Sequence, residues 1–304
     1  MSSMQKTVII IAGPTASGKT ALAIRIAQLF GSAVISADSR QCYREISIGT
    51  AKPSPEELSA VPHYFIDSHS IREELNAGVY EKLALQYAGE IFSCNDVAVM
   101  CGGTGLYIRA FTDGIDDMPV IPAGIRTRLN EQYTQHGITW LQEQLQQRDP
   151  GFYAIAETQN PQRLIRALEV LEATGRSITE FRTASRAVRD FRIIKTGITL
   201  PKELLHQNIH HRVDLMMQAG LVEEVKSVLP WRSHNALRTV GYEEIFDYLD
   251  GNITLEKAVE EIKTHTRQYA KRQLTWFRRD PDIKWFDSRE TDEILNYIRS
   301  VIKS

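Results

Sequence analysis

The sequence predicts an α/β protein built on an open parallel sheet, with a helical insertion and a helical C-terminal region. Short β-branched apolar runs recur along the first third of the chain, and helical patterns separate them. A glycine-rich turn joins the first apolar run to the first helical pattern. The 304 residues are 42% hydrophobic and 24% charged, which excludes a collagen-like, disulfide-stapled or disordered chain.

The start of the expected sheet is a strand–helix–strand unit. Thr7 to Ala12 is a buried parallel strand by its composition, and the helical pattern after it places Leu22, Ile26 and Leu29 on one face. Ala33 to Ala37 is the second strand, and such a unit crosses over right-handed. Residues 64–67 and 97–101 are two further strand candidates, with a helix at 80–92 between them.

Helical patterns dominate after Met118, at 125–136, 140–147 and 162–174. Phe191 to Leu200 is strand-like and is expected to return the chain to the sheet. Pro201 suits the first turn of a helix that runs to Gln218, and the longest helical pattern covers 255–277. The predicted division is a P-loop, nucleotide-kinase-like core of residues 1–117 and about 191–304, carrying a helical insertion domain at about 118–190.

Composition narrows the class of protein further. The formal net charge of −2 does not by itself indicate a nucleic-acid partner. Cys42, Cys94 and Cys101 are too few and too spread for a disulfide framework or a zinc site, which favours a reducing compartment. The chain has neither a run of about 18 apolar residues nor a signal-peptide pattern. We therefore expect a cytoplasmic protein with no membrane partner.

A phosphate-binding motif lies between the first strand and the first helix. GPTASGKT at 13–20 fits the P-loop pattern, in which backbone amides and a helix N-terminus surround a phosphate. Lys19 is expected to contact terminal phosphate oxygens, and the Thr20 hydroxyl to ligate Mg²⁺. The motif predicts a diphosphate or triphosphate ligand. The expected binding residues are Gly13, Pro14, Thr15, Ala16, Ser17, Gly18, Lys19 and Thr20.

The strand after the helix at 80–92 lacks the Asp that P-loop NTPases usually carry there, and Gly102-Gly103-Thr104-Gly105 follows it instead. The carboxylate follows the other strand, as Asp38. Ligands of open α/β sheets bind at the carboxyl ends of strands, so Asp38 and Thr104 are both expected at the P-loop mouth. From position alone, Asp38 is alternatively an N-cap or a water-mediated Mg²⁺ ligand, and residues 102–104 a plain turn.

Eight motifs occur in order over nearly the whole chain. They are GPTASGKT at 13–20, ADSRQ at 37–41, IGTAKP at 48–53, GGTGLY at 102–107, QRLIRALEV at 162–170, GLVEEV at 220–225, VGYEE at 240–244 and KRQLTWFRR at 271–279. Together they resemble the bacterial tRNA dimethylallyltransferases, also called tRNA isopentenyltransferases. The chain departs from the usual family pattern at Arg40, normally an apolar position, and at 158–161.

The resemblance implies transfer of a dimethylallyl group from its diphosphate to the exocyclic N6 of the adenosine 3′-adjacent to the anticodon in tRNA. Pyrophosphate is released, Mg²⁺ is the cofactor, and no ATP is hydrolysed. Asp38 matches the family's proposed base, Thr104 a threonine near the bridging oxygen, and Arg126 an arginine that reaches the same channel. With Lys19 they are the expected catalytic residues; for Arg126, a solvated helix face is the alternative.

The expected partners are dimethylallyl diphosphate and the tRNA anticodon stem-loop, bound by a monomer. Residues 263–279 hold six Lys or Arg and no acid, and Lys263, Arg267 and Lys271 form one helical stripe. Residues 162–195 hold eight Lys or Arg against four acids; a solvated face is the alternative for both segments. Tyr269 and Phe277 follow the apolar period and are expected in the core. The expected tRNA-binding residues are Asp38, Ser39, Arg40, Gln41, Gln162, Arg163, Leu164, Ile165, Arg166, Arg238, Thr239, Val240, Gly241, Tyr242, Lys263, Arg267, Lys271, Arg272, Gln273, Trp276 and Arg278.

Three other functions compete with this interpretation. A small-molecule P-loop kinase shares the core but leaves the helical segments without a purpose. A non-catalytic RNA-binding module would bind tRNA without a prenyl diphosphate. An adenine-nucleotide isopentenyltransferase would need no second docking surface for its small acceptor.

Overall fold

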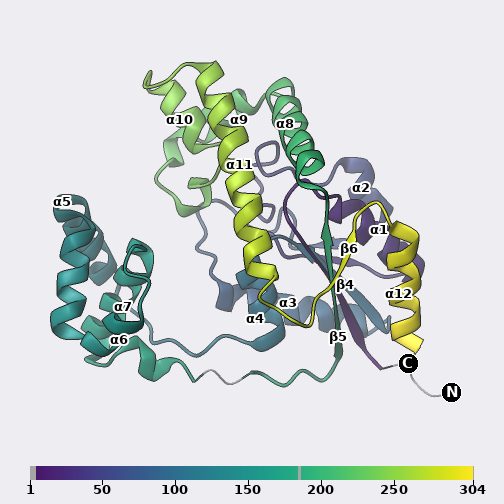
Figure 1. Ribbon diagram of the computed structural model, residues 1–304, viewed down its shortest axis with the longest axis horizontal. Helices are drawn as coiled ribbons and strands as arrows, with labels where there is room; N and C mark the ends of the chain where they lie inside the picture. The colour runs from purple at the N-terminus through teal and green to yellow at the C-terminus, as the bar shows by residue number, and fades with distance from the viewer. Residues whose placement is uncertain (1–4, 184–185, 304) are drawn as a thin grey trace. The chain divides into compact units, whose positions relative to one another are not determined.

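The protein was analysed as a computed structural model, which describes residues 5–183 and 186–303 (Figure 1). Two compact units make up the chain. One comprises Met1–Gly114 and Val188–Ser304, and the other is Ile115–Ala187. The sequence analysis places the insertion at about 118–190, and the smaller unit begins and ends three residues earlier on each side.

A six-stranded parallel sheet forms the centre of the larger unit, which confirms the predicted α/β class. The strands lie in the order β3-β2-β4-β1-β5-β6. As predicted, β5 returns the chain to the sheet, where it pairs with β1. The strand bounds are β1 Thr7–Ala12, β2 Val34–Ser36, β3 His63–Tyr64, β4 Val97–Gly102, β5 Arg192–Thr199 and β6 Lys284–Asp287.

Two details of the sheet differ from the prediction. β3 ends at Tyr64 instead of continuing to Asp67, because Phe65 (φ +64°) and Asp67 (φ +50°) take left-handed backbone conformations that end a strand. The sequence analysis missed β6, whose four residues carry too few apolar side chains to give a strand pattern.

Helices cover both faces of the sheet, as a buried parallel sheet requires. Ile9 and Ile11 of β1 pack with α1 (Lys19–Phe30) and α12 (Thr291–Lys303) on one side (Figure 1). Val8 and Ile10 pack on the other side with residues of α3 (Ala77–Phe92) and α4 (Gly105–Asp113). On α1, Leu22 and Ile26 are buried as expected, whereas Leu29 is exposed.

The remaining helices of the larger unit are α2 Pro55–Ala60, α8 Lys202–Gln218, α9 Leu221–Val228, α10 Glu243–Leu249 and α11 Leu255–Phe277. Of these, α8, α9, α10 and α11 add buried residues to the core that contains Val8 and Ile10, whereas α2 buries none. The predicted bounds of α11 are confirmed, and α8 begins one residue after Pro201. Of the residues expected in the core, Phe277 is buried, while Tyr269 is only half-buried.

The smaller unit is helical, with α5 Ala123–Arg148, α6 Pro150–Ile155, α7 Pro161–Thr174 and a 3₁₀ turn at Ile178–Phe181. Gly137, at φ +73°, interrupts α5, so the two predicted helices at 125–136 and 140–147 are indeed separate. Leu164 and Ile165 of α7 are fully buried in the core of this unit. Their side chains pack against other helices and are not available for the RNA contact expected of them.

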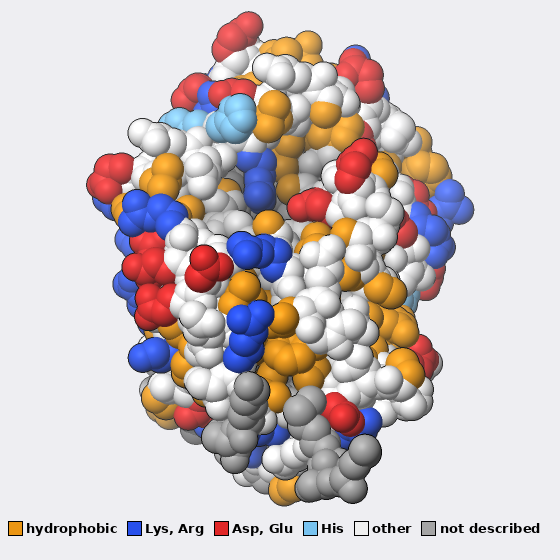
Figure 2. Space-filling view, turned by 90° about the vertical axis from the view of Figure 1, so that its right-hand side faces the viewer, with side chains coloured by type: hydrophobic (Ala, Val, Ile, Leu, Met, Phe, Trp, Pro, Cys, Tyr) orange, Lys and Arg blue, Asp and Glu red, His pale blue; other side chains and the backbone are white. Residues whose placement is uncertain are grey.

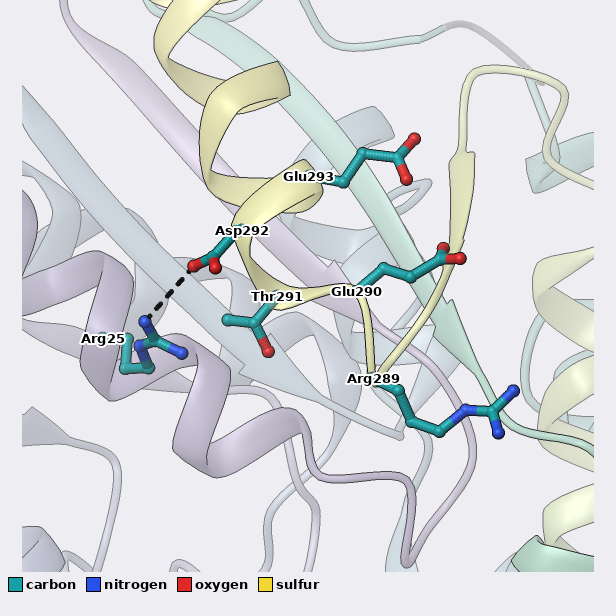
Figure 3. A pocket seen from close by; sticks show the side chains of 6 residues that line it. All are labelled: Arg25, Arg289, Glu290, Thr291, Asp292 and Glu293. Atoms are coloured by element: carbon teal, nitrogen blue, oxygen red, sulfur yellow. Dashed lines mark ion pairs between the residues drawn. The ribbon is translucent and has the colours of Figure 1, made fainter.

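The described helices and one face of the surface bear on the expected partners. None of the described helices is long and apolar enough to cross a bilayer. On the face in Figure 2, Lys and Arg side chains alternate with acidic and hydrophobic ones. A hollow at the start of α12 is lined by charged side chains, among which Arg25 and Asp292 point toward one another at 3.7 Å (Figure 3). No residue of the P-loop lines this hollow.

Candidate active site

The P-loop turns sharply between β1 and α1. Gly13 has φ +154°, and a Cβ there would lie 2.4 Å from the Ile198 carbonyl oxygen of β5, so the strand spacing requires glycine. Ala16 (φ +61°) and Gly18 (φ +86°) add two left-handed residues before the helix begins at Lys19. Left-handed residues in such a turn, directly before a helix N-terminus, are typical of backbone anion sites.

The Lys19 ammonium lies inside this loop. Its Nζ donates to the Pro14 carbonyl oxygen at 2.5 Å. Burial lowers the pKa of Lys19 to about 8, and the nearby Arg212 guanidinium lowers it as well, whereas Cys101 and Asp38 raise it. Two cations, Lys19 and Arg212, therefore lie at this loop. Such a pair suits the loop to bind an anion with several charges.

Two helices from the second half of the chain hold the P-loop in place. From α8, Arg212 Nη1 donates to Thr15 Oγ1 at 3.1 Å, and Asn208 Nδ2 donates to the Ala16 carbonyl oxygen at 3.2 Å. From α11, Gln273 Oε1 accepts from the Thr15 amide at 2.8 Å. The sequence analysis missed Arg212 and Asn208, because no local pattern connects α8 to a loop about 200 residues away.

Asp38 and Thr104 lie at neighbouring strand ends, as expected. Asp38 Oδ1 accepts from the amides of Arg40 (2.8 Å) and Gln41 (3.3 Å). Thr104 is joined to the same segment, since its Oγ1 accepts from the Ser39 amide at 3.0 Å and its amide donates to the Ala37 carbonyl at 3.1 Å. The close approach of β4 to this segment needs Gly102, whose Cβ would lie 2.2 Å from the Ala37 carbonyl oxygen.

Tyr269 of α11 also belongs to this site, although its spacing predicted a core residue. Burial and, next, the Asp38 charge raise the pKa of Tyr269, while the Arg40 charge and a side-chain hydrogen bond with Thr104 lower it, and the resulting pKa is about 12. The phenol is therefore protonated at neutral pH, and it lies within electrostatic reach of Asp38. The apolar spacing of α11 is the same for a core residue and for one that lines a site, so the sequence could not tell these two positions of Tyr269 apart.

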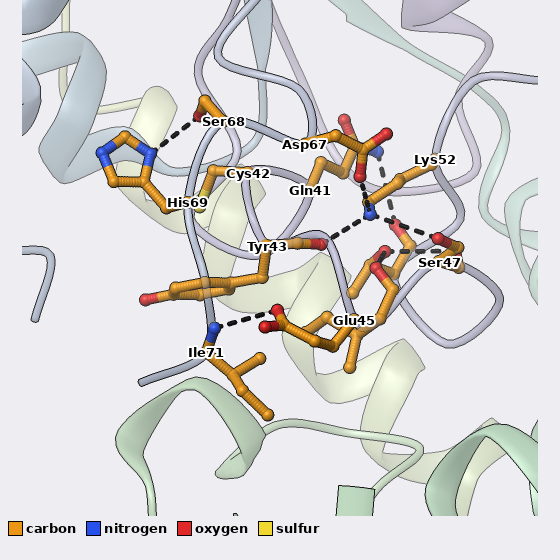
Figure 4. Close-up of polar contacts among 12 residues, drawn as sticks. Gln41, Cys42, Tyr43, Glu45, Ser47, Lys52, Asp67, Ser68, His69 and Ile71 are labelled. Atoms are coloured by element: carbon orange, nitrogen blue, oxygen red, sulfur yellow. Dashed lines mark hydrogen bonds and ion pairs between the residues drawn. The ribbon is translucent and has the colours of Figure 1, made fainter. Parts of the chain in front are cut away.

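The segment after Asp38 is braced internally. Gln41 Nε2 donates to the carbonyls of Thr50 (3.3 Å) and Ala51 (2.9 Å), so this amide is engaged within the protein. Figure 4 shows how Lys52 ties the same loop together: its Nζ donates to the Tyr43 carbonyl at 2.5 Å and forms an ion pair with Asp67.

The 238–242 segment divides into exposed and buried parts. Arg40 Nη2 donates to the carbonyl of Arg238 at 3.2 Å, which links the unusual arginine to this segment. Arg238 is exposed, and Thr239 and Val240 are half-buried. Gly241 and Tyr242 are buried.

Tyr242 is a packing residue and not the RNA contact that was expected. Its hydroxyl donates to Glu224 Oε1 at 2.5 Å, and burial raises its pKa well above the usual value. Glu224 in turn accepts from the amides of Ser47, Ile48 and Gly49. A Cβ on Gly49 would lie 2.6 Å from the Tyr242 ring, so this contact explains the glycine.

The expected basic stripe of α11 is only partly available to a partner. Lys263 and Arg267 bind groups within the protein, and Gln273 is buried. Lys271, Arg272 and Arg278 are exposed, and Trp276 is half-buried. The acids that pair with Lys263 are Asp214 of α8 and Glu260, one turn earlier on α11. Both lie outside the acid-free segment 263–279, so the composition of that segment did not predict the pairing.

The arginines of the smaller unit are also paired. Glu169 of α7 is 1% exposed and lies 3.4 Å from Arg126 Nε and 3.1 Å from Arg166 Nη1. Arg163 pairs with Glu157 at 2.7 Å, and Gln162 is exposed. Glu169 thus holds together an arginine expected in the catalytic channel and one expected to contact RNA.

The chain is similar to known proteins over its full length. Residues 41–280 match the family model described as IPP transferase. A tRNA dimethylallyltransferase of Cytophaga hutchinsonii is 44% identical over 100% of both chains, and one of Christiangramia forsetii is 46% identical over 99% and 100%.

Solved structures agree with these relatives. A tRNA isopentenylpyrophosphate transferase from Bacillus halodurans superposes with a TM-score of 0.72 at 34% identity, covering 98% of this chain and 97% of that one. A eukaryotic dimethylallyltransferase described as acting on tRNA gives a TM-score of 0.77 at 26% identity, covering 93% and 74%. With the P-loop, Asp38 and Thr104 gathered at one edge of the sheet, these similarities show that the chain belongs to the IPP transferase family.

Proposed function

We propose that this protein transfers a dimethylallyl group from dimethylallyl diphosphate to the N6 amine of the adenosine 3′-adjacent to the anticodon in tRNA. The observation that carries the proposal is the arrangement of the P-loop edge. Asp38 follows β2 and Thr104 follows β4, joined through Ser39, while Lys19 lies within electrostatic reach of Asp38. A diphosphate cradle thus adjoins a carboxylate that can accept a proton.

The geometry of Asp38 suits a general base. Both amide hydrogen bonds go to Oδ1, so neither of them occupies Oδ2. As the N6–C bond forms, the allylic C–O bond breaks and its electron pair leaves on pyrophosphate. Oδ2 of Asp38 takes the N6 proton, which makes the poorly nucleophilic adenine amine a competent acceptor. A positioned base of this kind contributes about 10²–10⁴-fold.

Charge on the departing pyrophosphate is stabilised by groups already in place. Lys19 places its ammonium at the P-loop, and Thr104 adds a hydroxyl at the adjoining strand end. Arg212 supplies a further cation beside Thr15. Preorganised donors aimed at developing charge are commonly the largest catalytic contribution.

The residues present fit a magnesium ion. Mg²⁺ usually takes one or two protein oxygens and fills its other positions with water and substrate phosphate oxygens. The Thr20 hydroxyl in the first turn of α1 would hold it, next to Lys19, whose pKa the Asp38 charge raises. No group of three or more His, Cys, Asp or Glu among the described residues offers a separate metal site. When bound, the ion would neutralise charge on the diphosphate.

We propose further that the protein acts on tRNA in the cytoplasm and as a monomer. The exposed cations Lys271 and Arg272 of α11, and Arg278 directly after it, support RNA docking, because phosphate contacts dominate nucleic-acid affinity. Arg163 of α7 is a further exposed cation, and the neutral Gln162 beside it is also exposed. The adenosine in a single-stranded loop is flipped at a cost of a few kcal/mol, which those contacts offset.

The test incubates the protein with radiolabelled dimethylallyl diphosphate, Mg²⁺ and unmodified tRNA, and measures label on adenosine. Parallel reactions offer AMP as acceptor, or γ-labelled ATP as donor with small-molecule acceptors. We expect label on tRNA only, and none with Lys19→Met. Label on AMP would favour a nucleotide prenyltransferase, phosphoryl transfer a kinase, and tRNA binding without any transfer an RNA-binding module.

A further inference from the structure

Gln273 joins two loops of the active site from a third element. It lies on α11 with 6% of its surface exposed. Its Oε1 accepts from the Thr15 amide of the P-loop at 2.8 Å, and its Nε2 donates to the Gly103 carbonyl after β4 at 2.9 Å. Both hydrogen-bonding ends of the side chain are therefore spent on backbone groups at the ends of two adjacent strands.

The approach of α11 to this turn leaves no room for side chains. A Cβ on Gly103 would lie 2.1 Å from Gln273 Nε2, and one on Gly105 would lie 2.1 Å from the Trp276 ring. Neither glycine has a positive φ, so the backbone conformation at these two positions does not itself require glycine. The glycines are needed because Gln273 and Trp276 occupy the space.

Only a carboxamide can make both contacts at once. An N–H needs an acceptor and a carbonyl needs a donor, and among side chains of this length glutamine alone carries one of each at neutral pH. A glutamate would keep the acceptor for Thr15 and lose the donor for Gly103. A methionine of similar length would leave both backbone groups without their partner.

We propose that Gln273 is a positioning residue of the diphosphate site. Its carboxamide fixes the P-loop relative to the turn that bears Thr104, so that the loop amides and the Thr104 hydroxyl address the same diphosphate. It acts with Arg212, which holds the side chain of Thr15 from the opposite helix. The inference rests on the proposed function for the identity of the ligand.

The experiment compares Gln273→Met, Gln273→Glu and Gly103→Ala with Gln268→Met, which alters an exposed glutamine of the same helix. Calorimetry gives the Kd of inorganic pyrophosphate with Mg²⁺, steady-state kinetics give kcat and the KM for tRNA, and thermal denaturation gives Tm. Binding of pyrophosphate is measured without prenyl transfer, so a failure of the proposed function is seen separately in the wild type.

We expect Gln273→Met to raise the Kd of pyrophosphate about tenfold and to lower kcat 10- to 100-fold, since a displacement of about 1 Å can cost 10²-fold in rate. The KM for tRNA should stay within twofold. Gln273→Glu should lie between Gln273→Met and the wild type. Gly103→Ala should reproduce the effect of Gln273→Met, because its Cβ displaces the carboxamide. Gln268→Met should match the wild type in every measurement.

Two results would overturn the proposal. If Tm falls in the Gln273 variants while pyrophosphate Kd and kcat are unchanged below the transition, the side chain serves stability alone. If the KM for tRNA rises while pyrophosphate binding is unchanged, Gln273 contacts RNA instead. Should Gln273→Met not fold, Gly103→Ala and Gln273→Glu decide between the same outcomes.

Discussion

The Lys263 ammonium on α11 lies 2.9 Å from Asp214 on α8 and 3.5 Å from Glu260. Its side chain is 14% exposed, and the hydrogen bond with Asp214 raises the pKa of Lys263. Arg267, one turn along, contacts His210 and Thr264 at 3.2 and 2.9 Å. The protein thus uses the first half of the basic stripe to attach α11 to α8.

We therefore predict that, within the 263–279 segment, the exposed cations from Lys271 onward contribute to RNA affinity and Lys263 does not. Lys271→Glu with Arg272→Glu should flatten the dependence of log K for tRNA on log salt by about 0.7–0.9 per lost phosphate contact. Lys263→Met should leave that slope unchanged and lower stability by about 1 kcal/mol or less, as for a partly exposed ion pair. Salt titrations of tRNA binding and thermal denaturation measure the two effects. An equal flattening by Lys263→Met would return this residue to the RNA surface.

Asp38→Asn is predicted to separate chemistry from binding. Asparagine keeps an oxygen to accept from the amides of Arg40 and Gln41, so the loop should retain its shape. It cannot take the N6 proton, and the single-turnover rate should fall by about 10²–10⁴-fold. The Kd values for tRNA and for pyrophosphate should change less than twofold. A wild-type rate in this variant would exclude Asp38 as the base.

Glu169→Gln is predicted to loosen the arginine pair of the smaller unit. The substitution removes the buried charge that Arg126 and Arg166 share, while the volume stays the same. The two arginines are 58% and 36% exposed, so solvent screens part of the loss, and we expect a destabilisation on the order of 1–2 kcal/mol. Denaturant unfolding measures it, with Glu131→Gln at an exposed position of α5 as the control.

The same variant has a kinetic signature. If Arg126 reaches the catalytic channel, Glu169→Gln should lower kcat, and the loss should not add to that of Arg126→Ala because one residue acts through the other. Fully additive losses in the double variant would show that Glu169 and Arg126 act independently.

The cysteines are predicted to differ sharply in reactivity. Burial raises the pKa of Cys42 to about 12 and that of Cys101 to about 11, whereas Cys94 is exposed. At pH 8 the thiolate fractions of the two buried residues are then about 10⁻⁴ and 10⁻³, and thiolate is the reactive form. Titration with a thiol reagent should count one fast thiol in the native protein and three in denaturant. Cys94→Ser should abolish the fast phase, and a remaining fast thiol would contradict the assignment.

The sequence by itself determined the elements and the chemistry that depend on local pattern. β1, α11 and the P-loop were predictable because each is specified by residues close together in the sequence. A strand and a helix show their periodicity within one segment, and the P-loop is one short motif. Asp38 and Thr104 were predictable as neighbours, because parallel strands bring their carboxyl ends to one edge.

Only the tertiary structure decided which partner each side chain meets. Lys263 and Gln273 lie on one helix within the acid-free segment 263–279, yet one binds Asp214 and the other the P-loop. Leu164 and Tyr242 lie within motifs that predict RNA contact, and both are buried. Periodicity shows which residues share a face, but the acid or backbone group that covers this face comes from a segment far away in the chain, and its position is fixed only when the core packs.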